Sequence, residues 1–71
     1  MGNLRVKFGK NLRRLRRQKD FTQEQLAEAA EISVEFLSNI ERGINAPSFE
    51  TLEKLSKILD VPAKELFDFD S

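Results

Sequence analysis

Two helix-start signals lie close together near the middle of this chain. Thr22-Gln-Glu-Gln25 is a capping box, in which the Thr22 hydroxyl accepts a hydrogen bond from the Gln25 amide and the Gln25 side chain reaches back. Ser33 supplies the next N-cap. We therefore predict two short helices, over 23–30 and 34–42, with room between them for a tight turn and nothing more.

The rest of the chain is also helical in pattern. Residues 4–19 carry one apolar stripe at steps of four, four and three, formed by Leu4, Phe8, Leu12 and Leu15. Ser48 caps a segment over 49–59, and Pro62 suits the first turn of a short helix over 63–67. Because no segment alternates with period two, we predict a compact, all-α, five-helix domain that takes up all 71 residues.

The composition excludes several kinds of site. The chain has no cysteine, hence no disulfide or thiolate metal site, and no histidine, the commonest general base and metal ligand. Four acids gather around the central turn without a nucleophile or metal set beside them: Glu24, Glu28, Glu31 and Glu35. We therefore expect no enzymatic activity, no cofactor and no metal. No apolar run approaches 18 residues and no signal-peptide core begins the chain, so we expect a cytoplasmic protein.

The net charge of zero hides a strong asymmetry. Residues 1–19 hold eight basic side chains and no acid, namely Arg5, Lys7, Lys10, Arg13, Arg14, Arg16, Arg17 and Lys19. This pattern favours a positive surface for a polyanion, although a solvated helix face that contacts nothing would have the same sequence. A membrane-surface helix is less favoured, because such helices present a wide apolar face and this stripe is narrow.

Two capped helices around a tight turn form a helix-turn-helix. Thr22-Gln-Glu-Gln-Leu-Ala-Glu-Ala-Ala30 followed by Glu31-Ile-Ser-Val-Glu-Phe-Leu-Ser-Asn-Ile-Glu-Arg-Gly43 resembles the XRE or lambda-repressor/Cro-like DNA-binding domains. Ala46-Pro-Ser-Phe-Glu-Thr-Leu-Glu-Lys-Leu55 and Leu59-Asp-Val-Pro62 resemble the fourth and fifth helices of that family. The resemblance covers about residues 4–67 and points in particular to standalone members, the phage repressors and restriction–modification controllers.

This resemblance implies that the 34–42 helix lies in the major groove of double-stranded DNA, while the start of the 23–30 helix meets the phosphate backbone. The implied base-reading positions are Ser33, Val34, Glu35, Ser38 and Asn39. Asn39 can pair with adenine, Glu35 with cytosine N4 and Val34 with a thymine methyl, although each could also be a plain solvent-facing residue. The candidate phosphate contacts are Thr22, Gln23, Arg42, Lys10, Arg13, Arg14 and Arg17, not all of which can face one duplex.

The resemblance also implies structural roles for one pair of residues and for one turn residue. In relatives, the residues matching Arg16 and Glu41 form a salt bridge that ties the first helix to the third. The family usually has glycine in the turn where this chain has Glu31, because the turn residue needs a positive φ. We therefore expect Glu31 to be tolerated there at a cost in stability of about 1 kcal/mol.

One such unit reads too few base pairs to be selective, so the resemblance implies a homodimer on a palindromic operator. The expected interface residues are Phe49, Leu66, Phe67 and Phe69, although Leu66 and Phe67 could instead close the core. The predicted function is that of a sequence-specific transcriptional repressor or controller. Activation would require a further contact with RNA polymerase, which the sequence does not locate. The alternative is a protein-binding module, such as an antitoxin or adaptor, built on the same fold.

Overall fold

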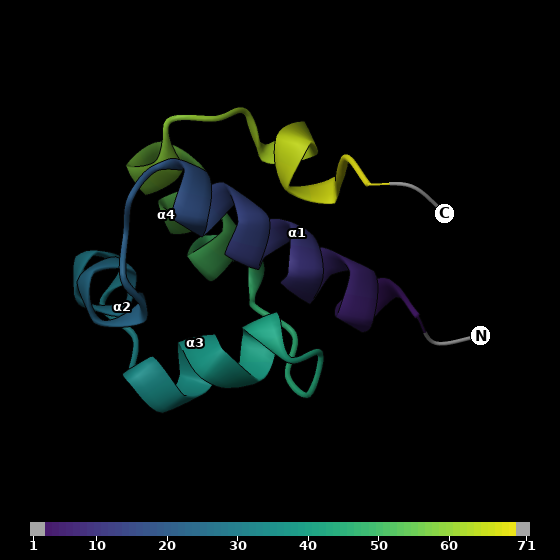
Figure 1. The fold of residues 1–71 in the computed structure, drawn as a ribbon, viewed down its shortest axis with the longest axis horizontal. Helices are drawn as coiled ribbons and strands as arrows, with labels where there is room; N and C mark the ends of the chain where they lie inside the picture. Colours follow the sequence, from purple (N-terminus) through teal and green to yellow (C-terminus); the bar gives the residue numbers. More distant parts are fainter. Residues whose placement is uncertain (1–2, 70–71) are drawn as a thin grey trace.

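The computed structural model describes residues 3–69, which form four α-helices and a final 3₁₀-helix (Figure 1). They are α1 (Leu4–Gln18), α2 (Gln23–Ala30), α3 (Val34–Glu41), α4 (Phe49–Leu59) and η1 (Ala63–Phe67). The predicted all-α class is confirmed, since the described residues contain no strand. The expected ends of α1 and α3, Lys19 and Arg42, are the C-cap residues of those helices.

The count of five α-helices is not confirmed, because the last segment winds as a 3₁₀-helix. Its hydrogen bonds join residues three apart, with the Glu65 amide donating to the Pro62 carbonyl at 2.9 Å and the Asp68 amide to the Glu65 carbonyl at 3.2 Å. A segment of five residues closes few i→i+4 bonds, so the tighter turn satisfies its backbone at least as well.

The predicted N-caps of three helices are all present. The Thr22 hydroxyl accepts from the Gln25 amide at 3.0 Å, and the Gln25 side chain accepts from the Thr22 amide at 3.0 Å. Ser33 and Ser48 accept in the same way from Phe36 and Thr51. Each cap satisfies an amide that the first turn of the helix leaves unpaired, so local sequence alone fixes where these helices begin.

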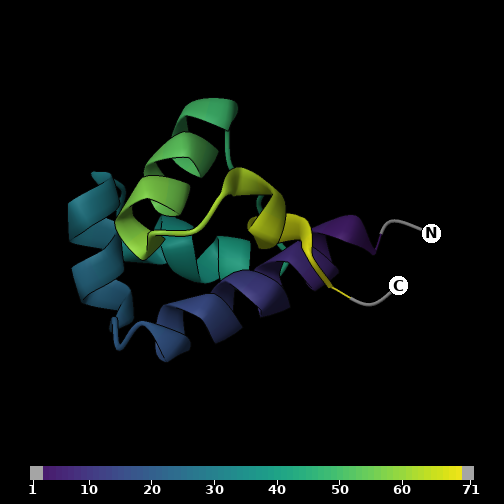
Figure 2. The same cartoon turned by 90° about the horizontal axis from the view of Figure 1, so that it is seen from above.

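The helices form two layers around one core. Figure 1 shows α1 running between α3 on one side and η1 on the other, with α2 seen nearly end-on and α4 behind. Figure 2, from above, shows η1 lying beside the first half of α1. The core consists of Phe8, Leu12, Leu15, Leu26, Ala27, Ala30, Leu37, Ile40, Leu55, Leu59 and Leu66. Leu4 departs from the expected stripe. It is 60% exposed, because the first turn of α1 extends beyond the core, which begins at Phe8.

Within residues 3–69, no helix is both long and apolar enough to span a bilayer.

The turn between α2 and α3 holds Glu31 in the left-handed region, at φ 61° and ψ 39°. Asp20 and Asp60 adopt similar values, and Gly43 has φ 79° after α3. Glu31 also forms an ion pair with Lys54, in which Lys54 Nζ donates to Glu31 Oε1 at 3.0 Å. Both side chains are exposed to solvent. An exposed pair of this kind contributes at most about 1 kcal/mol, and often much less.

Replacing Glu31 with glycine should therefore raise the melting temperature. Relief of the left-handed strain should stabilise the fold by about 1 kcal/mol, which raises the melting temperature by roughly 4–8 °C for a chain of this size. Loss of the ion pair with Lys54 reduces this gain. Differential scanning calorimetry measures the shift. Glu31→Ala is the control, because it removes the ion pair and keeps the strain, so it should give no gain. An unchanged or lower melting temperature for Glu31→Gly would contradict the strain argument.

Candidate functional site

The outer side of α3 presents the side chains that the sequence assigned to base reading. Ser33, Val34 and Glu35 at its start are exposed, and Ser38 and Asn39 one turn later are half-buried. The Ser33 hydroxyl is occupied as the N-cap, accepting from the Phe36 amide at 3.0 Å. Glu35 and Asn39 make no side-chain hydrogen bond to another residue within 3–69, so their polar groups are available to a ligand.

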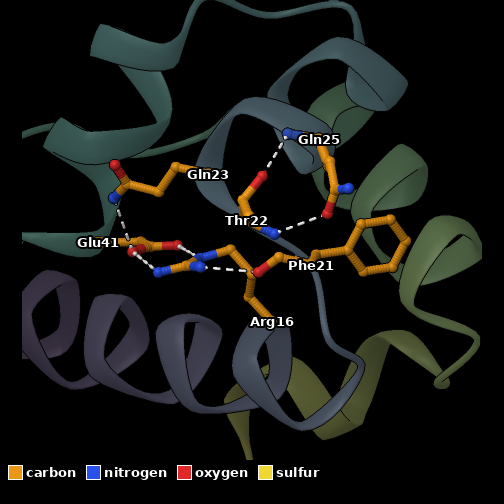
Figure 3. Close-up of polar contacts among 6 residues, drawn as sticks. All are labelled: Arg16, Phe21, Thr22, Gln23, Gln25 and Glu41. Carbon is orange, nitrogen blue, oxygen red and sulfur yellow. Dashed lines mark hydrogen bonds and ion pairs between the residues drawn. The ribbon is translucent and has the colours of Figure 1, made fainter.

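A buried ion pair locks α3 to α1 (Figure 3). Arg16 Nε donates to Glu41 Oε2 at 2.7 Å, and Arg16 Nη2 donates to Glu41 Oε1 at 3.2 Å. The Arg16 and Glu41 side chains are only 9% and 2% exposed. Arg16 Nη1 also donates to the Phe21 carbonyl at 2.8 Å, which ties down the segment leading into α2. The bidentate geometry fixes both the distance and the rotation between the two helices.

Gln23 joins this network from the first turn of α2. Its Nε2 donates to Glu41 Oε1 at 3.0 Å, so the carboxylate receives hydrogen bonds from both α1 and α2 (Figure 3). The side chain proposed to meet a phosphate is therefore already held by a partner from α3. Thr22, one residue earlier, is exposed while its hydroxyl caps the helix. The start of α2 is thus set in a fixed position relative to α3.

A glycine permits the close contact between α1 and α3. A Cβ placed on Gly9 would lie 2.4 Å from the Ile40 carbonyl oxygen and 2.5 Å from the Glu41 carbonyl oxygen. Both oxygens belong to backbone that cannot rotate away. Gly9 therefore lets the two helices approach closely enough for Arg16 to reach Glu41.

The cations of α1 divide between two sides of that helix. Gly9 marks the side that touches α3, and at 100° per residue Arg13 and Arg17 lie about 40° and 80° further round. These two exposed arginines border α3. Arg42, also exposed, is the C-cap of α3.

Arg14 lies on the other side of α1, which faces η1. Arg14 Nη2 donates to Asn11 Oδ1, and Asn11 Nδ2 donates to the carbonyls of Glu65 and Leu66 at 2.9 and 2.8 Å. Lys10 stands between the two sides, about 100° from both Gly9 and Asn11. The structure therefore does not group Arg14 with α3, because the helix turns its side chain toward η1.

An apolar groove lies between the start of α1, the start of α4 and η1. Phe49 is 86% exposed and Phe67 is 44% exposed, and the Phe67 ring centroid lies 5.0 Å from that of Phe8. The groove has a volume of about 200 Å³ and also includes Leu4 and Leu52.

Leu66 is not part of this surface. The expectation that it lies at an interface is wrong, because its side chain is fully buried in the core. Phe69 is half-buried and packs against the core, so it offers less free surface than its place after η1 suggested. The turn of η1 separates the two neighbours, turning Leu66 inward and Phe67 outward.

Gly9 and Asn11 are structural residues that sequence reasoning missed. A lone glycine inside a helical pattern often marks a close backbone approach, and this was the available signal for Gly9. Asn11 is a polar residue beside Leu12, and it is only 4% exposed. Its partners are backbone carbonyls 54 and 55 residues later, which no local pattern reveals.

Solved structures of similar proteins share this fold. The restriction-modification controller protein C.AhdI from Aeromonas hydrophila matches with a TM-score of 0.84 and 39% identity, over 87% of this chain and 94% of that one. SinR, described as the master regulator for biofilm formation and solved in complex with DNA, matches with a TM-score of 0.80 and 37% identity, over 86% of this chain and 98% of that one.

The sequence comparisons agree with the structural ones. Control protein C.BamHI of Bacillus amyloliquefaciens is 40% identical over 68 residues, covering 94% of this chain and 84% of that protein. The regulator SinR of Bacillus subtilis is 38% identical over 62 residues, but this chain spans only 56% of its length. A family model described as helix-turn-helix matches residues 12–66. The chain therefore belongs to the XRE-type helix-turn-helix family, whose members here are transcriptional regulators and restriction–modification control proteins.

Proposed function

We propose that this protein is a transcriptional regulator that binds double-stranded DNA in a sequence-specific manner through α3. The observation that carries this proposal is the fixed placement of α3 and of the start of α2 by Arg16, Glu41 and Gln23. Sequence-specific recognition requires side chains held in a defined register against base edges. The similarity to control proteins and to a regulator solved with DNA supports the same function.

The side chains of α3 would read bases in the major groove. Asn39 would pair with an adenine, Glu35 would accept from a cytosine amino group and Val34 would contact a thymine methyl. Ser33 and Ser38 lie beside them at the groove floor. The carboxylate of Glu35 is repelled by phosphates, so it would add selectivity and little affinity.

Phosphate contacts would supply most of the affinity. The start of α2, from Thr22 and Gln23 onward, offers the positive end of a helix dipole and the amides of Gln23 and Glu24, which the capping box leaves unpaired. Arg13, Arg17 and Arg42 add charge around α3. Each neutralised phosphate releases counterions, so operator binding should weaken steeply as salt rises.

The protein would bind its operator as a homodimer. The exposed rings of Phe49 and Phe67, with Leu4, form an apolar surface of the kind that protein interfaces bury. A two-fold dimer would place two copies of α3 about one helical turn apart, roughly 34 Å, on a palindromic site. Mass action between monomer and dimer would then make operator occupancy depend on protein concentration.

Selection of bound duplexes from a random pool tests this function. The purified protein should enrich a palindrome with half-sites about one turn apart. Failure of the folded protein to enrich any sequence would reject sequence-specific binding.

Asn39→Ala should weaken binding to the selected operator by about 10- to 100-fold. A bidentate pair with adenine contributes about 1–3 kcal/mol of discrimination, so the loss should be specific to one base pair in each half-site. Fluorescence anisotropy on operators substituted at single positions locates that pair. Gln18→Ala, at the exposed end of α1, is the matched control and should bind like the unsubstituted protein. Equal weakening on all sequences would make Asn39 a phosphate contact.

Phe49→Ser should weaken the dimer by about 30-fold or more, since a central aromatic at an interface contributes roughly 2 kcal/mol. Because Phe49 is almost fully exposed, the fold should remain intact. Sedimentation velocity measures the dimer, and Ile44→Ser, at an exposed apolar residue outside the groove, is the control. A protein that is monomeric at high micromolar concentration without any substitution would favour the alternative, in which the groove receives a different protein.

A further inference from the structure

Three cations of α1 point away from the side that touches α3. Lys7, Lys10 and Arg14, which we call the outer basic face, follow one another at steps of three and four and so form one row along the helix. No acid lies between residues 3 and 19. The described part of the chain has two ion pairs, Arg16–Glu41 and Lys54–Glu31, and neither involves this face.

Lys7 and Arg14, the two ends of this face, cannot contact a duplex bound to α3. At 100° per residue, Lys7 and Arg14 lie about 160° and 140° around α1 from Gly9, which touches α3. A duplex on the outer side of α3 is separated from them by both helices, each about 10 Å in diameter. Figure 1 shows the same order, with α1 between α3 and η1. Lys7 and Arg14 therefore have no role in the operator contact proposed above.

The surface is open and shaped for an extended ligand. A hollow between α1 and the segment after η1 is lined by Lys7, Lys10, Asn11, Arg14, Asp68 and Phe69. A second hollow continues from it along α1 toward the two arginines that border α3 and is lined by Lys10, Arg13, Arg14, Arg17 and Gln18, with no apolar side chain. Protein interfaces are depleted of charge at their centre and rich in aromatic residues, so this all-polar stretch suits a polyanion better than a protein.

The spacing of the row agrees with a nucleic acid backbone. From Lys7 to Arg14 the helix rises about 10 Å, a length over which one DNA strand presents about three phosphates. We propose that the outer basic face binds the phosphate backbone of a second DNA duplex, so that protein seated on its operator can bridge two DNA segments. This inference rests on the proposed DNA-binding function. Contacts to phosphate alone would make the second duplex weakly held, independent of sequence and strongly sensitive to salt.

A bridging assay tests the proposal. An operator duplex of about 20 base pairs is fixed to beads and saturated with protein, and capture of a labelled duplex without operator sequence is measured from 50 to 200 mM salt. Because both copies of α3 are engaged on the palindrome, capture must use another surface. We expect capture at low salt that falls steeply over this range.

Lys7→Gln removes one charge from the face and leaves the bond between Arg14 and Asn11 intact. Second-duplex capture should fall about threefold or more, while operator affinity changes less than about 1.5-fold, because Lys7 lies on the far side of α1 from α3. Lys64→Gln is the matched control, because it removes the same charge from an exposed position of η1. Conversely, Asp68→Asn removes the one acid lining the first hollow and should increase capture several-fold.

Each failure has a distinct meaning. No operator binding at all would reject the proposed function itself. Normal operator binding without capture, or equal loss in Lys7→Gln and Lys64→Gln, would overturn the second-duplex site. If operators lengthened to 40 base pairs bind more tightly and Lys7→Gln abolishes that gain, the face holds flanking DNA of the same duplex, and bridging is overturned. Tighter binding of polyglutamate than of a duplex of equal charge would overturn it in favour of an acidic protein segment.

Discussion

Arg16→Ala should lower the free energy of unfolding by about 3–5 kcal/mol, because it leaves the Glu41 carboxylate buried with only Gln23 as a partner. It also removes the hydrogen bond that holds the Phe21 carbonyl. A chain of 71 residues has a total stability of only about 4–11 kcal/mol. Folding and DNA binding should therefore be lost together, as measured by urea unfolding and by operator titration.

A double substitution separates the effect of losing the whole ion pair from the effect of leaving one buried charge without its partner. Arg16→Met with Glu41→Leu removes both charges and keeps apolar volume, and buried pairs replaced in this way are often neutral or stabilising. We expect it to recover most of the stability lost in Arg16→Ala. Operator affinity should stay reduced, because Gln23 then has no carboxylate to hold it. A well-folded Arg16→Ala protein that lacks only DNA affinity would make Arg16 a phosphate contact and contradict the structural role.

Gly9→Ala should destabilise the protein by about 2–3 kcal/mol, which corresponds to roughly 10–20 °C in melting temperature. Alanine is the better helix former by up to about 1 kcal/mol, so propensity alone predicts the opposite sign. The contacts decide the outcome, since the new methyl would lie 2.4 Å from a backbone oxygen of α3. Relief requires α1 and α3 to move apart, which also stretches the Arg16–Glu41 pair.

Thermal unfolding followed by circular dichroism measures the effect of Gly9→Ala. Lys10→Ala is the neighbouring control, because its side chain is exposed and its loss should change stability by less than about 0.5 kcal/mol. An increase in melting temperature for Gly9→Ala would mean that α1 and α3 are further apart than the structure has them.

The helix starts were predictable because their causes are local. Thr22, Ser33 and Ser48 each bond an amide three residues later, so the capping pattern is visible in the sequence itself. Glu31 is a similar case, because a turn this short between two capped helices requires a left-handed residue directly after the first helix. The family's pattern identified the position, and the structure gives its φ as positive.

The residue types of the candidate site were predictable from the sequence, but which cations of α1 lie beside α3 was not. The sequence placed Asn39 and Glu35 on the outer face of one helix, where they lie. It could not divide the cations of α1, because a helix flanked by arginines and lysines on all its solvent sides has no preferred face in isolation. That division depends on where α3 and η1 dock, at Gly9 and Asn11 respectively.

The sequence by itself determined the all-α class, the bounds of the four α-helices to within a residue and the family to which the chain belongs. Those properties follow from capping, periodicity and motif, which act over a few neighbouring positions. Only the packing of the whole chain makes Leu66 buried while Phe67 is exposed and turns Arg14 toward η1, away from α3. These outcomes depend on contacts between residues 25 to 55 positions apart, such as Arg16 with Glu41 and Asn11 with Leu66, whose energies are set by packing and not by local pattern.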